Sequence, residues 1–139
     1  MIKEFKKEYL DEIMNIWLQT NIETHDFISK DYWNANFKNV EEIIPHSLIY
    51  IFEENNIIKG FIGLNNDNIE GLFVLKRYQK EGIGTKLLNK SKIAQNSLSL
   101  KVYVKNKIAI SFYEKNGFEI IKKELDENTN EYEYIMKWI

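Results

Sequence analysis

Apolar residues recur at helical spacing near the start of the chain, and elsewhere they gather in short runs. A stripe of apolar residues three or four positions apart predicts an amphipathic helix over about Glu8 to Thr20. A second helical stretch follows and ends near Pro45. Ile2 to Phe5 precedes both and has the pattern of a short strand. The first third of the chain therefore predicts one strand and then two helices.

Strand patterns occupy the middle and the end of the chain. The runs LIYIFEE and IIKGFIGLN flank Asn55 and Asn56, a pair typical of a hairpin turn, and NIEGLFVL predicts the next strand. Farther on, LSLKVYV alternates apolar and polar residues. FEIIKKEL and YEYIMKWI predict two closing strands around the polar turn DENTNE.

Two helices interrupt these later strands. The first runs from Gly82 to about Ala94, and the second starts at Asn106 and stops at Gly117. The resulting order is β-α-α-β-β-β-α-β-α-β-β, which predicts a mixed α/β (α+β) fold with one mixed sheet. We expect the early strands to be antiparallel, and the crossover through the first of these helices to be parallel and right-handed.

Composition narrows the classes of function. A length of 139 residues predicts a single domain over residues 1–139. The formal net charge of -2 disfavours broad contact with nucleic-acid phosphates, and the absence of cysteine excludes disulfides and a thiol nucleophile. The start of the chain is charged, unlike a signal peptide, and no apolar run reaches the ~20 residues of a membrane span. We expect a cytoplasmic monomer or homodimer with no nucleic acid, membrane or metal partner.

The stretch QKEGIG, from Gln79 to Gly84, lies between a predicted strand and a predicted helix. Glycines let a ligand approach the main chain, and the first amides of a helix lack intrahelical partners and attract anions. Neither a dinucleotide motif nor a P-loop fits, because Leu87 and Arg77 stand where glycines are required. The residues alone leave two interpretations, an ordinary turn or a phosphate site.

Two ordered motifs resemble the GNAT superfamily of acetyl-CoA-dependent N-acetyltransferases. Gln79 to Gly84 fits the family's Gln/Arg-x-x-Gly-x-Gly/Ala pyrophosphate motif. The second signature, N-x-x-A-x-x-F-Y-x-x-x-G-F, is matched by Asn106, Ala109, Phe112, Tyr113, Gly117 and Phe118. The spacing of the two motifs and the order of elements over the whole chain also fit, and THDFISKDYW is similar to a group of small bacterial members. The resemblance implies the GNAT acyl-CoA N-acyltransferase fold.

The resemblance also implies a reaction and a cosubstrate. The acetyl group of acetyl-CoA would pass to a primary amine by direct attack in a ternary complex, without a metal. Two strands would splay apart, and main-chain groups of Leu72, Phe73 and Val74 would bind the pantetheine arm like an added strand. The side chain of Asn106 would contact the same arm. Main-chain amides of the glycine turn would hold the pyrophosphate, namely Gln79, Lys80, Glu81, Gly82, Ile83, Gly84 and Thr85.

Tyr113 occupies the position of the family's general acid. A phenol with a pKa near ~10 is protonated at neutral pH and can supply a proton to the departing thiolate. Without the resemblance, a buried tyrosine of the core explains the same residue. For the base we consider Glu70, in a strand that should face the acceptor, as well as His25 and water. An exposed edge glutamate is the alternative explanation of Glu70.

The irregular segment between the first two helices is rich in aromatic residues. We expect Phe27, Tyr32 and Trp33 to pack the core and also to form a wall of the acceptor pocket, where aromatic faces suit a cationic amine. His25 fits an acceptor contact better than a base. Protein N-termini, lysine side chains and small amines all remain possible acceptors. The alternative function is a catalytically silent acyl-CoA-binding sensor on the same fold.

Overall fold

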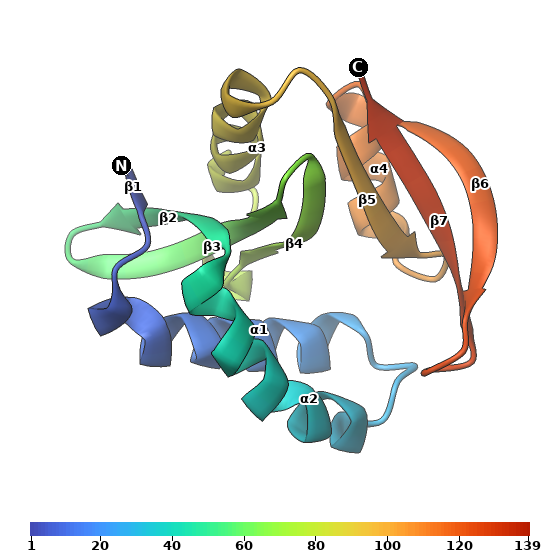
Figure 1. Cartoon of the computed structure of the whole chain (residues 1–139), viewed down its shortest axis with the longest axis horizontal. Coiled ribbons are helices and arrows are strands. Elements are labelled where there is room, and N and C mark those ends of the chain that lie inside the picture. The colour runs from blue at the N-terminus through green and yellow to red at the C-terminus, as the bar shows by residue number, and fades with distance from the viewer.

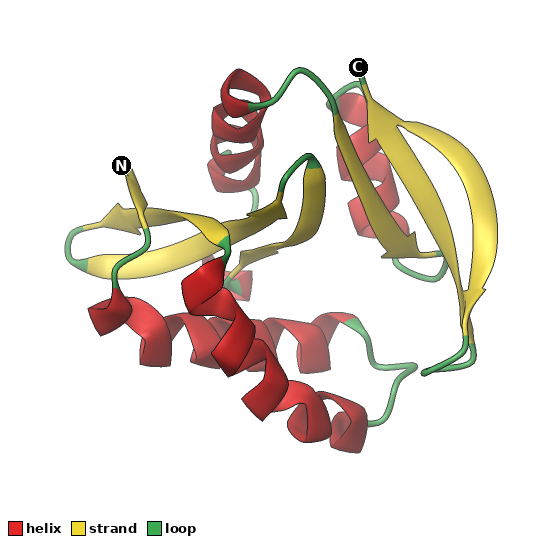
Figure 2. Cartoon of the chain, in the orientation of Figure 1, coloured by secondary structure: helices red, strands yellow, loops and turns green.

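The computed structural model describes residues 1–139 as one seven-stranded sheet flanked by four α-helices (Figures 1 and 2). The strands are β1 (Ile2–Glu4), β2 (Leu48–Glu54), β3 (Ile57–Asn65), β4 (Asn68–Val74), β5 (Leu98–Tyr103), β6 (Glu119–Asp126) and β7 (Glu131–Trp138). The helices are α1 (Leu10–Thr24), α2 (Lys30–Ile43), α3 (Ile83–Ala94) and α4 (Lys107–Lys115). Short 3₁₀ helices are η1 (Lys7–Tyr9), η2 (Ile44–His46) and η3 (Lys76–Tyr78). The predicted order and the mixed α/β class are confirmed.

The bounds of the first helix differ from the sequence prediction. The 3₁₀ turn η1 precedes it, so that α1 begins at Leu10, and it continues to Thr24 instead of ending at Thr20. The buried residues Thr20 and Asn21 explain the longer helix, because tertiary contacts hold its last turn against the rest of the molecule. Their polar side chains are satisfied within the helix by the carbonyls of Ile16 and Trp17.

The strands lie in the order β1-β2-β3-β4-β5-β7-β6. All neighbours are antiparallel except β4 and β5, which the crossover through α3 makes parallel, as predicted. In Figure 1 the β1–β4 part of the sheet and the β5–β7–β6 part diverge from each other, with α1 and α2 below the first part. The place where the two parts separate is the centre of the candidate site described below.

Alternation along the strands divides the core into two clusters. Along β2, Ile49 and Ile51 face the cluster under α1 and α2, whereas Tyr50 and Phe52 face the cluster under α3 and α4. Apart from Tyr103, no residue of β5, β6 or β7 belongs to the cluster under α1 and α2. The face of β5–β7–β6 on that side therefore lacks a covering helix.

Asparagine and glycine residues form the hairpin turn and the helix caps, as the sequence predicts. Asn55 and Asn56 adopt φ values of 54° and 63°, which suits a tight hairpin. The side chain of Asn106 caps α4 by accepting from the Ala109 amide at 3.2 Å. Gly117, which follows the C-cap residue Asn116 of that helix, has a φ of 92°. These local signals fix where β2, β3 and α4 begin and end.

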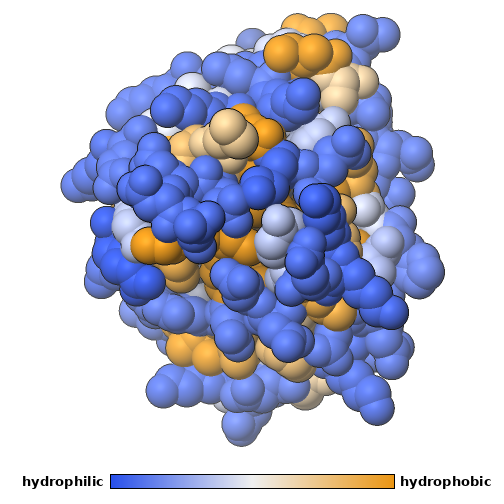
Figure 3. Space-filling model, turned by 90° about the vertical axis from the view of Figure 1, so that its left-hand side faces the viewer, coloured by the Kyte–Doolittle hydropathy of each residue, from blue (hydrophilic) through white to orange (hydrophobic).

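Hydrophilic residues predominate on the face shown in Figure 3, where apolar residues form separate small patches. None of the helices is both long enough and apolar enough to span a membrane.

Gly60 lies opposite Val74 at a point where β4 leaves no room for a side chain on β3, and its replacement tests this packing. A Cβ at Gly60 would meet the Phe73 carbonyl oxygen at 2.6 Å, so Gly60→Ala should lower the free energy of unfolding by about 1–3 kcal/mol. Gly63→Ala is the control, because its Cβ would meet only the flexible Cδ1 end of Ile49, at 3.1 Å. Urea unfolding measures both variants. Equal losses would contradict the assignment of close backbone packing to Gly60.

Candidate active site

The two halves of the sheet separate between β4 and β5. These strands pair only at Asn68 with Ser99 and at Ile69 with Leu100, although β4 continues to Val74 and β5 to Tyr103. A cavity of about 540 Å³ opens where the pairing stops. Residues from β4, β5, α1, α2 and α4 line it, so the splayed strands bring distant parts of the chain to one place.

The free edge of β4 presents particular main-chain groups to this opening. The Leu75 amide donates to the Lys59 carbonyl of the neighbouring strand at 2.9 Å. Antiparallel pairs alternate between bonded and unbonded positions, so Phe73 directs its main-chain groups toward β3 while Leu72 and Val74 direct theirs away from it. The Val74 carbonyl accepts instead from the Gln79 side-chain amide at 3.0 Å. Leu72 and Val74 thus carry the outward-facing peptide groups, and Phe73 does not.

The glycine turn exposes a row of main-chain amides. The Gln79 amide donates to Lys76 and the Lys86 amide donates to Gly82, but the six amides from Lys80 to Thr85 have no main-chain acceptor. Lys80 and Gly82 both have positive φ, at 68° and 82°. Alternating left- and right-handed residues form a concave amide surface that binds anions. The geometry therefore fits a phosphate group.

The two glycines of this turn serve different physical purposes. A Cβ at Gly82 would meet nothing within 4 Å, so Gly82 supplies the left-handed backbone and leaves open space above it. A Cβ at Gly84 would approach Phe112 Cζ to 3.2 Å, so Gly84 lets α3 lie close to α4. Ile83 between them is buried in the core and anchors the start of α3.

Tyr113 extends from α4 to the cavity and is almost completely buried. Its ring packs edge-on against Phe112 and Phe118, at centroid distances of 5.2 and 5.4 Å. Burial alone raises the pKa of the Tyr113 phenol above its ordinary value, so the phenol holds its proton throughout the neutral range. This arrangement suits a proton donor in an enclosed site.

His25 bridges α1 and α4 across the opening. Its Nδ1 lies 3.1 Å from Asn21 Oδ1, and its Nε2 lies 3.4 Å from Asn106 Nδ2. Asn106 Oδ1 already accepts from the Ala109 amide, so its Nδ2 can only donate, and a neutral His25 with the proton on Nδ1 satisfies both contacts. Burial lowers the pKa of His25 to about 4. A weakly basic imidazole with both nitrogens engaged is poorly suited to remove a proton.

Aromatic rings surround His25 where α1 and α2 border the opening. The ring of Trp33 stacks on that of His25 with a centroid distance of 5.4 Å. The rings of Tyr103 and Phe27 pack against it in T-shaped arrangements, with centroid distances of 5.2 and 5.7 Å. Tyr32 packs against Trp33 at 4.9 Å. Of the four residues predicted to contact the acceptor, His25, Tyr32 and Trp33 line the cavity, whereas Phe27 lies behind His25 and does not. Packing against the rings of His25 and Tyr103 holds Phe27 outside the cavity.

Three carboxylates also line the cavity. Glu70 is the one that the sequence singled out; it is exposed and occupies the bulge in β4 that leaves it without a partner on β3. Asp126 and Glu133 were missed. Asp126 accepts from the Tyr103 hydroxyl at 2.8 Å. This contact joins residues 23 positions apart, and no local pattern in the sequence indicates it.

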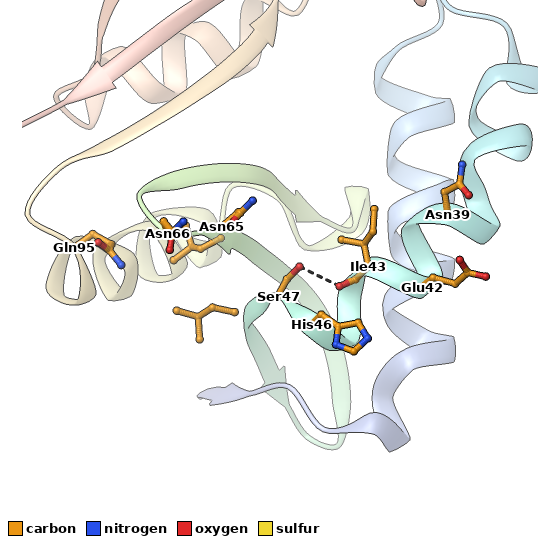
Figure 4. Close-up of a pocket in the computed structure, with 10 residues that line it drawn as sticks. Asn39, Glu42, Ile43, His46, Ser47, Asn65, Asn66 and Gln95 are labelled. Atoms are coloured by element: carbon orange, nitrogen blue, oxygen red, sulfur yellow. Dashed lines mark hydrogen bonds between the residues drawn. The ribbon is translucent and has the colours of Figure 1, made fainter.

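A second and larger cavity, of about 760 Å³, lies elsewhere, between the end of α2, the start of β2 and the turn after β3. Figure 4 shows its side chains spread around an open groove, with Ser47 donating to the Ile43 carbonyl at 3.1 Å. None of the residues predicted from the sequence lines this cavity. We place the candidate site at the splayed strands, because the predicted catalytic residues Tyr113 and Glu70 meet three of the four predicted acceptor residues there; the glycine turn, Val74 and Phe27 do not line this cavity.

Residues 45–120 match the family model described as an acetyltransferase (GNAT) domain. This chain belongs to the GNAT acetyltransferase family. It is 29% identical over 140 residues to the peptidyl-lysine N-acetyltransferase YiaC of Escherichia coli K12, covering 99% of this chain and 96% of YiaC. The solution structure of apo YjaB from Escherichia coli superimposes with a TM-score of 0.87 at 22% identity, covering 100% of this chain and 97% of YjaB.

The same fold occurs with a bound coenzyme. The PaiA N-acetyltransferase of Thermoplasma acidophilum, solved in complex with coenzyme A, superimposes with a TM-score of 0.80 at 20% identity, covering 99% of this chain and 97% of PaiA. The family assignment confirms the fold and the acyltransferase class predicted from the two sequence motifs.

The depressed pKa of His25 predicts a pH dependence of stability. Because the pKa falls from an ordinary 6.5 to about 4 on folding, the unfolded chain binds a proton more readily than the folded one. Stability is then lost as the pH falls from about 6.5 toward 4. Between pH 7 and pH 5 this residue should account for a loss of about 2 kcal/mol, which His25→Gln removes.

Urea unfolding at the two pH values measures this difference. His46→Gln is the matched control, since it removes the other histidine, which is exposed. If the unfolding free energy of His25→Gln still fell with pH as steeply as that of the wild type, His25 would not be the buried neutral group described here.

Proposed function

We propose that this chain transfers the acetyl group of acetyl-CoA to a primary amine by direct attack in a ternary complex, with a protein lysine as the acceptor. The observation that carries the proposal is the loss of β4–β5 pairing after Ile69, which opens a cavity lined by Tyr113 and Glu70. The similarity to a peptidyl-lysine N-acetyltransferase over nearly the whole chain supports the choice of acceptor. Acetyl-CoA supplies a thioester whose carbonyl carbon can accept the amine nitrogen.

The exposed main-chain groups fit this cosubstrate. Leu72 offers an outward-facing amide and carbonyl that suit the amides of a pantetheine arm, and Val74 offers its amide, since its carbonyl already accepts from Gln79. The amides from Lys80 to Thr85 suit the pyrophosphate, because six donors are free of main-chain acceptors at the start of a helix. Asn106 Nδ2 has one hydrogen toward His25, so its second can reach a group in the opening.

Tyr113 is the proposed general acid. Its phenol gives a proton to the sulfur as the carbon–sulfur bond breaks, and its raised pKa keeps that proton available beforehand. Glu70 is the proposed base, acting directly or through water, because a neutral amine is required for attack and His25 has no free ring nitrogen. His25, Tyr32 and Trp33 form the acceptor wall, and Phe27 supports it.

Gly82→Glu tests the phosphate site. A carboxylate beside the free amides should repel the pyrophosphate and lower the affinity for coenzyme A by about 100-fold or more. Gly82→Ala is the control, since it carries the same left-handed strain, of about 1 kcal/mol, without a charge. Calorimetric titration measures binding, and circular dichroism checks the fold. Equal affinities of the two variants would contradict a phosphate at this turn.

Tyr113→Phe tests the proton donor. Removing the hydroxyl should lower kcat by about 10²-fold or more, because the thiolate then departs without a proton. Coenzyme affinity and stability should stay close to those of the wild type. Burial is the one cause of the raised pKa of this phenol, so the substitution removes no polar contact of the hydroxyl within the protein. Thiol release with a lysine peptide measures the rate, and Tyr134→Phe is the control. Undiminished turnover, with the chemical step limiting, would rule out this role.

A further inference from the structure

The uncovered face of β5–β7–β6 carries several charged side chains, and only some of its carboxylates form ion pairs. Glu124 forms ion pairs with Lys101 at 3.2 Å and with Lys122 at 3.5 Å. Glu133 stands directly opposite Glu124 on the neighbouring strand and has no ion-pair partner. Asp126, at the end of β6, has none either, and only neutral groups donate to it. Negative charge is therefore balanced near Glu124 and left over near Asp126 and Glu133.

Both uncompensated carboxylates line the active-site cavity and are half-buried. Tyr103 connects them, since it pairs with Glu133 across β5 and β7 and its hydroxyl donates to Asp126. Partial burial and the nearby charges of Asp126 and Glu124 raise the pKa of Glu133, and the charge of Lys101, which lines the same cavity and pairs with Glu124, offsets only part of this rise. Because Lys101 is shared with Glu124, the carboxylates of Asp126 and Glu133 are withdrawn from water without a cation of their own, and a bound cation would restore the free energy that this costs.

These carboxylates lie on the opposite face of the sheet from the proposed acid. Tyr113 belongs to the core cluster under α3 and α4, whereas Tyr103 belongs to the cluster under α1 and α2. The cavity reaches both faces through the gap between β4 and β5. A cation held at Asp126 and Glu133 is thus separate from an amine that reacts beside Tyr113.

A third group in the cavity also lacks a partner. Trp33 is 7% exposed, and its indole Nε1 is buried without a hydrogen-bond partner. An unpaired buried donor favours a ligand that brings an acceptor, such as a peptide carbonyl. A cavity lined by this tryptophan and by two carboxylates that have no ion-pair partner fits a peptide that carries a basic side chain.

We infer that Asp126 and Glu133 select acceptors that carry a second positive charge close to the reacting lysine. This inference rests on the proposed function, because it concerns the acceptor of the same reaction. The carboxylates act on specificity and take no part in the proton transfers. The flanking residue recognised would be an arginine or a lysine of a protein substrate.

Paired peptides test the inference. Each pair has one central lysine, blocked ends, and either arginine or citrulline at one neighbouring position, so that charge differs while shape is nearly conserved. With saturating acetyl-CoA, thiol release gives kcat/KM, and mass spectrometry verifies the modified lysine. The wild type should favour the arginine peptide by about tenfold at low salt, and by less at high salt.

Asp126→Asn and Glu133→Gln should each reduce this preference by several-fold while leaving kcat/KM for the citrulline peptide unchanged. The side-chain amide introduced by Asp126→Asn retains an oxygen for the Tyr103 hydroxyl, and Glu133→Gln leaves that bond untouched. Glu127→Gln is the matched control, since it removes the same charge from an exposed neighbour that does not line the cavity. It should keep the full preference.

The outcomes separate the two proposals. Equal use of both peptides by the wild type would overturn the inference while leaving the lysine acetyltransferase activity intact. An equal loss with both peptides in the variants would also overturn it, because the carboxylates would then act on the reacting amine itself. If no peptide in either series releases thiol, the proposed acceptor is wrong, and the inference fails with it.

Discussion

The end of hydrogen bonding between β4 and β5 is the constraint on which the site depends. Two paired positions hold the strands together, and beyond Ile69 each strand is left with a free edge. A bulge at Glu70 shifts the alternation of β4, so that Leu72 and Val74 present their peptide groups to the gap. Phe73 folds its ring over Gly71, where a Cβ could not fit. The same local irregularity thus creates the opening and orients what faces it.

An open sheet needs other contacts to keep its halves in place. Part of that connection comes from His25, which joins the end of α1 to the first residue before α4. Because α4 carries Tyr113, this link connects the aromatic wall proposed to hold the acceptor with the residue proposed as the acid. The neutral imidazole suits such a structural contact, since protonation would place a donor against the Asn106 amide, itself a donor.

The sequence predicted the elements well because their signals are local. Helical spacing, the asparagine pair of the hairpin, the cap at Asn106 and the stop at Gly117 each act within a few residues. The resemblance of two short motifs also identified the family that the comparisons confirm. The bounds of α1 were less accurate, because packing against the sheet extends that helix to Thr24.

By itself, the sequence determined the order of the elements and the family, and it singled out the glycine turn from Gln79 to Thr85; the structure showed that the Gln79 amide is already bonded and that the amides from Lys80 to Thr85 are free of main-chain acceptors. The tertiary structure decided which side chains share the cavity. It placed Phe27 behind His25, directed the peptide groups of Phe73 toward β3, and brought Tyr103, Asp126 and Glu133 together. The physical reason is that strand register and bulges set which distant residues meet, and neither has a signature within a short stretch of sequence.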